Sequence, residues 1–294
     1  MLAHLHQQPK WPDRVVVMGA AGFVGGALVK RLSGSDVPTL ALCRSEVDLL
    51  APNASEKLAA VLRPSDTFVA VAARAPCKNV PMLVENMTMT AAMIAALGKS
   101  PVAHVINISS DAVYADSSGP LDENSLMAPG TLHGVMHLAR EISFRSEVRV
   151  PLAMLRPSLL YGAADPHNGY GPNRFRRLAN DGQDIVLFGA GEERRDHVLI
   201  DDVAEIIARV IAHRSTGAIN IATGTVHSFH DIAQLVVACA HRSINIKGSP
   251  RSGPMPHNGY RAFDITALRA AFPDFSHTPL AEGLALAQQQ QVGG

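Results

Sequence analysis

Short apolar runs rich in β-branched residues alternate with longer amphipathic segments up to residue 162 of the chain. The runs, which predict buried strands, span residues 14–19, 37–43, 66–73, 102–109 and 152–162. The helical patterns between them span residues 23–33, 54–63, 83–98 and 132–146. Because strands that alternate with helices pair in parallel through crossover connections, the pattern predicts an α/β fold with a doubly wound parallel sheet.

The alternation ends after residue 162, in the Gly/Pro/Asn-rich stretch ADPHNGYGPN. An apolar helical pattern near 201–213 then resembles the helical patterns found before residue 162. We therefore expect residues 13–162 to form one domain that 196–222 completes. Residues 163–195 and 223–294 would form a smaller C-terminal lobe. Ligands of open α/β sheets bind beyond the carboxyl ends of the strands, where such a lobe would supply substrate contacts.

A glycine-rich turn, GAAGFVGG, joins the first predicted strand to the first predicted helix. It places Gly19, Gly22 and Gly25 in the order G-x-x-G-x-x-G. Glycine permits the tight turn and lets the backbone approach a pyrophosphate, whose charge then lies at the helix N-terminus. Glycines also mark ordinary turns, but between strand and helix of an alternating domain they favour a Rossmann-type dinucleotide site.

The residue just past the second predicted strand bears on which dinucleotide fits. A carboxylate there would hydrogen-bond the adenosine ribose, whereas an arginine would pair with a 2′-phosphate. The stretch ALCRSEVDLL has Arg44 at this point, with Asp48 and Leu49 close to the expected adenine. Arg44 therefore favours NADP over NAD; the alternative is a solvated surface arginine.

Composition and charge exclude several classes of protein. Lysine plus arginine equal aspartate plus glutamate, 26 against 26, so there is no broad basic field to recruit nucleic acid or an anionic membrane. The three cysteines, Cys43, Cys77 and Cys239, form no CxxC pair, which argues against a disulfide framework and a thiolate metal site. The N-terminus lacks a signal-peptide core, and we expect no run of about 18 apolar residues. A cytoplasmic protein with no nucleic-acid or membrane partner is therefore expected.

Several motifs, taken in order, resemble those of a known family. The stretches GAAGFVGG, INISSDAVYADSSGPLDENS and GEERRDHVLIDDVAEII are similar to those of extended short-chain dehydrogenase/reductases, in particular the NAD(P)-dependent epimerase/dehydratase group acting on nucleotide sugars. The resemblance runs from residue 14 to about 285 and implies an enzyme that oxidises, reduces, epimerises or dehydrates a sugar carried on a nucleoside diphosphate. The segment CRSEVDLLAP looks most like the reductase branch, which commonly uses NADPH. With the resemblance, the predicted cofactor contacts are Gly19, Gly22, Phe23, Val24, Gly25, Arg44, Asp48, Leu49, Ala72, Ala73, His137 and Pro157.

The resemblance also implies where catalysis would occur. The family uses a serine or threonine hydroxyl, a tyrosine that moves the proton, and a lysine four residues later. Ser110 in ISSDAVY occupies the hydroxyl position, and Asp111 follows it where some dehydratases have an acid. In PGTLHGVMHLARE, however, His133 falls on the tyrosine and His137 on the lysine. Both usual catalytic positions are therefore substituted.

The histidine pair allows three interpretations. An imidazole has a pKa near roughly 6.5, so His133 would be basic at neutral pH without a cationic neighbour, and hydride chemistry would be retained. Alternatively the chain binds the cofactor with weak or no hydride transfer, as a regulatory protein or pseudo-enzyme. A metal site is the third interpretation, because i and i+4 share a helix face, but glutamate does not follow His133 and no third ligand is evident. We favour retained chemistry and expect no metal.

On the substrate side, the resemblance assigns phosphate contacts to Arg195 and Arg261, whose planar guanidinium groups can each bond two oxygens. The alternative is two exposed, solvated arginines. Asn173 is a candidate for the sugar or base, whereas Leu159 replaces an asparagine that the family often carries. Asp201 and Asp202 are expected to cap the following helix. The stripe of Met87, Met89 and Met93 is expected in the core and in a helix pair of the kind through which such proteins form homodimers.

Overall fold

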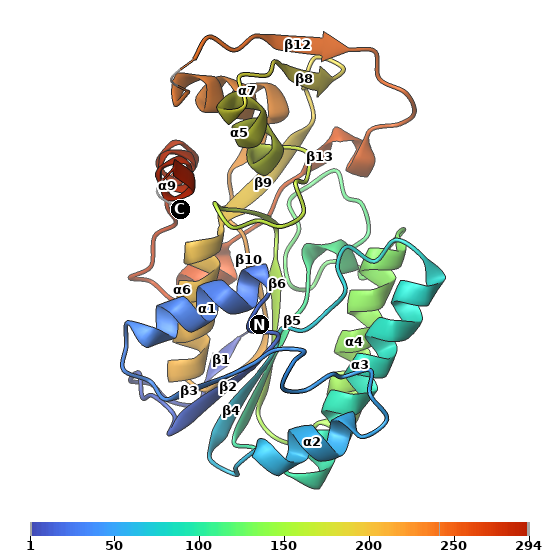
Figure 1. Ribbon diagram of the computed structural model, residues 1–294, viewed down its shortest axis with the longest axis vertical. Helices are drawn as coiled ribbons and strands as arrows, with labels where there is room; N and C mark the ends of the chain where they lie inside the picture. Colours follow the sequence, from blue (N-terminus) through green and yellow to red (C-terminus); the bar gives the residue numbers. More distant parts are fainter. Residues whose placement is uncertain (1, 241, 293–294) are drawn as a thin grey trace.

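The computed structural model describes residues 2–240 and 242–292. Its centre is a seven-stranded sheet in the order β1-β10-β6-β5-β4-β2-β3, in which every neighbouring pair is parallel except β1 with β10 (Figure 1). The strands are β1 (Ala3–His4), β2 (Arg14–Met18), β3 (Thr39–Leu42), β4 (Asp66–Ala70), β5 (His104–Ile108), β6 (Leu152–Pro157) and β10 (Ser215–Ile221). The predicted doubly wound α/β fold is confirmed.

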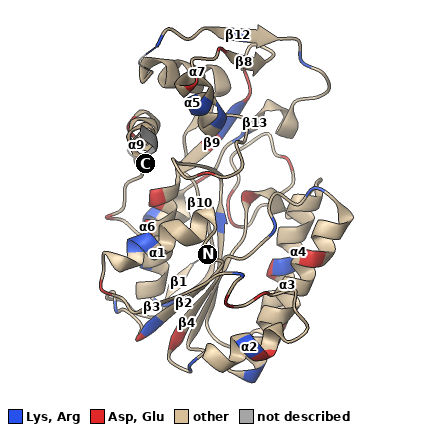
Figure 2. Ribbon diagram, viewed as in Figure 1, with Lys and Arg blue, Asp and Glu red and all other residues tan. Residues whose placement is uncertain are grey.

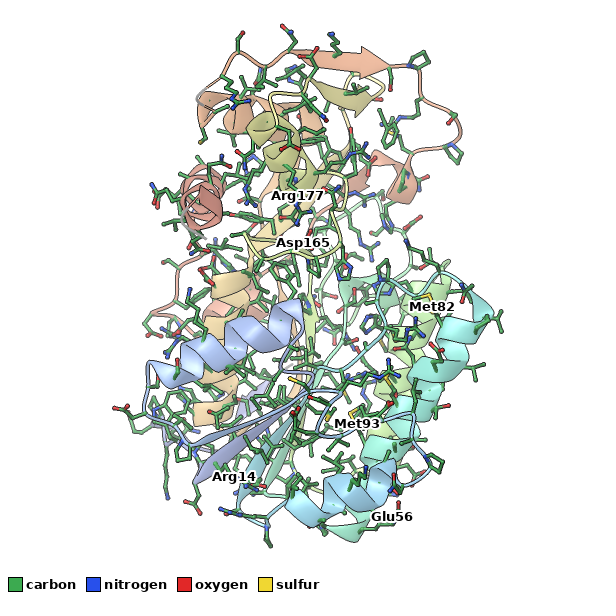
Figure 3. The ribbon with its side chains drawn as sticks, viewed as in Figure 1. Arg14, Glu56, Met82, Met93, Asp165 and Arg177 are labelled. Carbon is green, nitrogen blue, oxygen red and sulfur yellow. The ribbon has the colours of Figure 1, made fainter. Side chains whose placement is uncertain are left out.

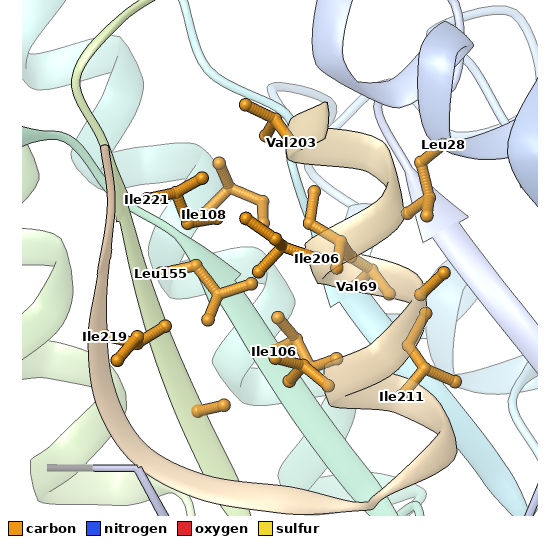
Figure 4. Packing of buried hydrophobic residues seen from close by; sticks show 14 of the residues in the cluster. Leu28, Val69, Ile106, Ile108, Leu155, Val203, Ile206, Ile211, Ile219 and Ile221 are labelled. Atoms are coloured by element: carbon orange, nitrogen blue, oxygen red, sulfur yellow. The ribbon is translucent and has the colours of Figure 1, made fainter. Parts of the chain in front are cut away.

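Helices cover both faces of the sheet. They are α1 (Phe23–Ser33) and α6 (Ile200–Ala212) on one face, and α2 (Ala54–Val61), α3 (Val80–Lys99) and α4 (Leu132–Glu147) on the other. Alternate residues of a strand point to opposite faces, so Val15 and Val17 pack in the cluster that contains α1 and α6, and Val16 and Met18 in the other. Ile206 of α6 lies against Ile106 and Leu155 of the sheet (Figure 4). Both apolar faces are therefore buried, as the continuous apolar runs require.

A second group of elements stands beyond the carboxyl ends of the central strands, and we call it the cap. Its strands are β7 (Leu159–Tyr161), β8 (Ile185–Phe188), β9 (Arg194–Leu199), β11 (Val226–Ser228), β12 (Ile246–Ser249) and β13 (Tyr260–Arg261). Its helices are α5 (Pro172–Asn180), α7 (Phe229–Ala238), η2 (Pro256–Gly259) and α9 (Leu280–Val292). Tyr161, Phe175 and Phe229 are buried in a core of its own. Helix α8 (Thr266–Ala271) returns to the central sheet, where it contacts β10.

Three expectations about single elements need correction. The expected strand 152–162 is two strands in two sheets, because Ser158 breaks it by donating its hydroxyl to Asp196 Oδ1 at 2.9 Å. Strand β1 was not expected, since two residues carry no periodic signal. The acidic pair does not cap α6: the N-cap position is Leu199, and Asp202 instead accepts hydrogen bonds from the backbone and hydroxyl of Thr278.

The sequence has no uninterrupted run of about 18 apolar residues, as expected, but one helix is long and apolar enough on average to cross a membrane. By length and composition, α3 is such a helix. Met89 and Met93 of its apolar side are buried against the sheet, and Figure 3 shows Met93 on that side. Buried core helices of soluble proteins share this composition, so α3 is weak evidence for a membrane span. Positive and negative residues are interspersed over the elements (Figure 2).

Candidate active site

A cavity of about 1550 Å³ lies between the carboxyl edge of the central sheet and the cap. Its volume exceeds the roughly 300–1,000 Å³ of an ordinary small-molecule site, which leaves room for two ligands side by side. Every residue proposed for the site from sequence lines it except Gly25. These lining residues are Gly19, Gly22, Phe23, Val24, Arg44, Asp48, Leu49, Ala72, Ala73, Ser110, Asp111, His133, His137, Pro157, Asn173, Arg195 and Arg261.

The glycine turn between β2 and α1 is a cradle that side chains would fill. Gly19 has φ +103°, which favours glycine, and a Cβ there would lie 2.6 Å from the backbone nitrogen of Ala72. Gly25 does not line the cavity, but a Cβ on it would lie 2.1 Å from the carbonyl oxygen of Gly19. Helix α1 begins after Gly22 with no side-chain cap, so its first amides face the cavity. The turn therefore fits the pyrophosphate of a dinucleotide.

Gly25→Ala is expected to lower both stability and dinucleotide affinity, because the new methyl group overlaps the carbonyl oxygen of Gly19. Overpacking of this kind costs about 1–3 kcal/mol. Gly26→Ala is the matched control, since its Cβ would meet the carbonyl oxygen of Ala20 at an ordinary 3.5 Å. Thermal unfolding and calorimetric titration with NADPH measure both effects. A Gly25→Ala protein with the melting temperature and affinity of the Gly26→Ala protein would contradict this role of the turn.

Arg44 and Asp48 lie together where the adenosine end of a dinucleotide is expected. Nη2 of Arg44 is 3.2 Å from Oδ2 of Asp48, and the Arg44 side chain is 80% exposed. Asp48 Oδ1 also accepts a hydrogen bond from the backbone of Leu50. An exposed ion pair holds its partners weakly, so the Arg44 guanidinium can turn toward an incoming anion at little cost.

The loop after β5 presents Ser110 and Asp111 to the cavity. Ser110 begins the short helix η1 (Asp111–Val113), where its Oγ accepts a hydrogen bond from the backbone nitrogen of Ala112 at 3.1 Å. The same hydroxyl lies 3.3 Å from Asp111 Oδ1. Asp111 Oδ2 accepts from Nε of Arg261 at 2.8 Å. The loop after β5 is thus tied to the cap by a carboxylate–guanidinium pair.

Helix α4 brings His133 beside this loop. Its N-cap, Thr131, accepts a hydrogen bond from Gly134, and a Cβ on Gly134 would lie 2.1 Å from the carbonyl oxygen of Ala112. Glycine therefore permits the close packing of α4 on η1. His133 Nδ1 accepts a hydrogen bond from the backbone nitrogen of Cys77 at 3.4 Å. Burial lowers the pKa of His133, and the nearby Asp111 carboxylate partly opposes this.

His137 lies one turn along α4 and meets His133 edge to face, with ring centroids 4.7 Å apart. It is 6% exposed, and within residues 2–240 and 242–292 its Nδ1 has no hydrogen-bond partner. Burial lowers the pKa of His137 well below its usual value, and His133 and Arg140 lower it further. The ring is therefore neutral at physiological pH and carries no lysine-like charge.

A buried cation lies farther along the same helix. Arg140 is fully buried and donates to Asn107 Oδ1 at 2.7 Å and to the carbonyl oxygens of Ala70 and Ala72 at 2.8 and 2.5 Å. Burial lowers its pKa to about 10, so it remains charged at neutral pH. Arg140 thus joins α4 to the end of β4, just below the cavity wall formed by Ala72 and Ala73.

The two substrate-side arginines are buried rather than solvated. Arg195 is 6% exposed and directs Nε and Nη2 to Glu193 Oε1, at 2.8 and 2.5 Å. Arg261 is 4% exposed and contacts both Asp111 and Nδ1 of His257. The exposed-arginine alternative is therefore wrong, and each predicted phosphate ligand already has a carboxylate partner.

Asn173 and His197 have structural contacts in the same wall. The Asn173 amide accepts from the backbone of Gly162 and donates to the carbonyl of Leu160, which fixes the loop after β7. His197 packs edge-on against Phe229, and burial lowers its pKa to about 3. A sugar contact for Asn173 stays a prediction.

The third interpretation of the histidine pair finds no support in the geometry. In the part of the chain that the structure describes, no three His, Cys, Asp or Glu side chains are grouped to hold a metal ion. The edge-to-face rings of His133 and His137 pack on one another instead.

Other lining residues were not found from sequence. They include Pro76, His167, Glu193, Arg251 and His257. His167 belongs to a loop that also contains Asp165. Nη1 of Arg177 lies 3.6 Å from Oδ2 of Asp165 and holds this loop (Figure 3). The position of His167 in the site depends on how the loop after β7 packs in the cap. The local sequence carries no signal for that packing. Glu193, by contrast, lies two residues before Arg195, so its carboxylate could have been predicted as a partner of that arginine.

Comparison with known proteins agrees with this geometry. The sequence model described as "NAD dependent epimerase/dehydratase family" matches residues 15–222. The chain belongs to this family. A dTDP-4-dehydro-6-deoxy-D-allose reductase from Streptomyces bikiniensis is 24% identical, over 94% of this chain and 95% of that protein. The matched range contains the glycine turn and the central strands whose carboxyl ends border the cavity.

Two solved structures of similar fold bind different dinucleotides. The UDP-glucose 4-epimerase of Thermus thermophilus, in complex with NAD, is 19% identical with a TM-score of 0.81, covering 96% of this chain and 99% of that one. A GDP-L-fucose synthetase from Naegleria fowleri, bound to NADP, is 16% identical with a TM-score of 0.82, covering 99% and 97%. At these identities the likeness shows the epimerase/dehydratase fold alone.

Proposed function

We propose that this chain is an NAD(P)-dependent enzyme that reduces, epimerises or dehydrates a sugar carried on a nucleoside diphosphate, with Ser110 and His133 at the reacting carbon. The observation that carries the proposal is a single cavity lined by the glycine turn, by Ser110 and His133, and by the cap arginines. Family membership and relatives named for dTDP-, UDP- and GDP-sugars support the substrate class.

The glycine turn, Arg44 and the Ala72–Ala73 wall would hold the dinucleotide, which when bound supplies or takes up a hydride. Ser110 would hydrogen-bond the sugar oxygen that changes between alcohol and carbonyl. His133 is neutral and accepts at Nδ1, so its ring hydrogen is on Nε2, which can donate to the same oxygen. Negative charge that develops on this oxygen would be stabilised by the two donors.

His137 cannot hold a positive charge in this site, because its surroundings keep it neutral. It would serve as a hydrogen-bonding ring against the nicotinamide ribose. Arg140 provides a permanent charge one turn farther along α4, and it holds the carbonyl groups beneath the dinucleotide. The positive charge of Arg140, beneath the cofactor, would thus partly replace the charge that the family normally places on a lysine.

For the cofactor we propose a preference for NADP, which rests on Arg44. Arg44→Ala is expected to weaken NADPH binding about 10- to 100-fold, as loss of a charge-assisted hydrogen bond to phosphate implies. NADH binding should change little, and it is the internal control. Calorimetric titrations of wild type and variant with both dinucleotides test this. Tighter binding of NADH than of NADPH by the wild type would contradict it.

The competing function is a dinucleotide-binding protein without turnover, favoured by the neutral His137 ring at the family's lysine position. Both functions predict NADPH binding, but the enzyme must also bind a nucleotide sugar in the same cavity. Thermal shift of the NADPH-loaded protein with dTDP-, UDP- and GDP-sugars is the first test. No stabilisation by any of them would remove the support for the substrate class.

We further propose that α3 and α4 mediate a homodimer and that the protein works in the cytoplasm. Val80, Val84 and Ile142 on these helices are exposed apolar residues, which supports an interface there.

A further inference from the structure

The unusual feature of the substrate side is a buried acid among its arginines. Glu193 is 5% exposed, lines the cavity and directs Oε1 to both Nε and Nη2 of Arg195. Its other oxygen, Oε2, lies 3.6 Å from Nη1 of Arg251, which lines the same cavity. A single carboxylate thus lies between two guanidinium groups, in the manner of an anionic ligand.

The Glu193 carboxylate occupies the edge of the Arg195 guanidinium that would bind a phosphate best. A guanidinium bonds an oxyanion bidentately along its Nε–Nη2 edge or across its two Nη groups. Glu193 occupies the first edge, and Nη2 also donates to the carbonyl oxygen of Pro256 at 3.2 Å. Among the hydrogen bonds of residues 2–240 and 242–292, Nη1 of Arg195 takes part in none, so one amino group is left for a ligand.

Arg261 cannot compensate for this. Its Nε and Nη2 donate to the side chain and backbone of Asp111, and its Nη1 contacts His257. Arg251 donates Nη2 to the carbonyl oxygen of Phe188, at 3.1 Å. Each of the three arginines therefore has at least one protein partner before any phosphate enters. Among the described residues, Nη1 of Arg195 and the buried Nε of Arg251 make no hydrogen bond.

We propose that Glu193 is an internal competitor for the substrate's diphosphate and sets the affinity of the site. The inference rests on the proposed nucleotide-sugar substrate. A diphosphate must either displace the Glu193 carboxylate from Arg195 or bind beside a like charge in a buried wall, and both lower affinity. The site thereby holds its arginines in place when empty and releases the phosphorylated product readily.

Glu193→Gln tests the proposal, because glutamine keeps an oxygen that can accept from Arg195 but removes the charge. We expect the Kd for the nucleoside diphosphate that binds best among UDP, dTDP, GDP and ADP to fall about tenfold or more, as like-charge repulsion in a buried site implies. Glu282→Gln is the matched control: it makes the same change on the exposed side of α9 in the cap, at a residue that does not line the cavity, and should leave the Kd unchanged.

The sign of the effect distinguishes this role from a purely structural one. If Glu193 only orients Arg195 for phosphate, Glu193→Gln will weaken diphosphate binding, and a weaker or unchanged Kd overturns the proposal while leaving the proposed function intact. If neither wild type nor variant binds any nucleoside diphosphate although both bind NADPH, the substrate class fails and the inference fails with it.

A measurement on the wild type covers the case in which Glu193→Gln does not fold. Two unopposed charge-assisted hydrogen bonds would make a diphosphate bind about 10²–10⁴-fold tighter than its nucleoside. With Glu193 in competition, we expect a ratio below about tenfold. A ratio of about 10³ in the wild-type protein, within that unopposed range, overturns the proposal.

Discussion

Replacing His133 by alanine is expected to lower the rate of hydride transfer by about 10²–10³, the usual cost of removing one hydrogen-bond donor to an oxygen that develops negative charge. Ser110 would still bond the substrate oxygen, but the second donor to that oxygen would be lost. Because the His133 ring contacts the Cys77 backbone and the His137 ring, and not the glycine turn, NADPH affinity should be retained. Single-turnover absorbance at the nicotinamide band measures the rate.

His133→Tyr provides the second arm of this experiment. A neutral phenol hydroxyl can also donate a hydrogen bond to the substrate oxygen. Tyrosine should therefore keep more of the wild-type rate than alanine does, without the support of a lysine-like charge, because His137 is neutral. If the wild-type protein and the alanine variant bind both ligands and are equally inactive, the chain is a dinucleotide-binding protein without turnover.

Glu141→Ala is expected to lower the free energy of unfolding by about 3–5 kcal/mol, the usual cost of breaking a buried ion pair. Glu141 is fully buried and accepts Nε and Nη2 of Arg156, each at 2.8 Å. Arg156 is 1% exposed and also donates to the hydroxyl of Tyr114 at 2.7 Å. Removing the carboxylate leaves the buried guanidinium without the negative charge that balances it.

Urea unfolding followed by circular dichroism measures this loss. Glu147→Ala on the exposed end of the same helix is the matched control, and a surface substitution of this kind should stay within about 0.5 kcal/mol of the wild type. A loss below about 1 kcal/mol for Glu141→Ala would show that Arg156 finds water or another partner.

Much of the fold followed from periodicity alone. Apolar runs such as RVVVM are buried on both faces of a parallel sheet, so their strands and the helices between them were predictable. The break at Ser158 was not, because the chain remains extended on both sides and changes sheets through a hydrogen bond to Asp196, which is remote in sequence. Asp202 likewise bonds Thr278 rather than its own helix.

The site could be predicted wherever local spacing fixes position. The i, i+4 spacing places His133 and His137 on one face of α4, and the glycine spacing places the turn before α1. The contact of Cys77 with His133 and that of Asp111 with Arg261 join segments 56 and 150 residues apart, which no pattern reveals. The charges of the arginines were visible in the sequence, but their neutralisation by Glu193 and Asp111 was not.

The most direct test of hydride chemistry in this site follows the transferred atom. NADPH deuterated at the nicotinamide C4 position is incubated with the wild-type protein and a panel of nucleotide-linked 4-keto sugars. The masses of the products are then measured by mass spectrometry. With the wild-type protein we predict a sugar nucleotide one mass unit heavier than the product made with unlabelled NADPH. His133→Ala should form far less of this labelled product. No deuterium in any sugar, from protein shown to bind both ligands, would contradict reduction of the sugar by NADPH in this site.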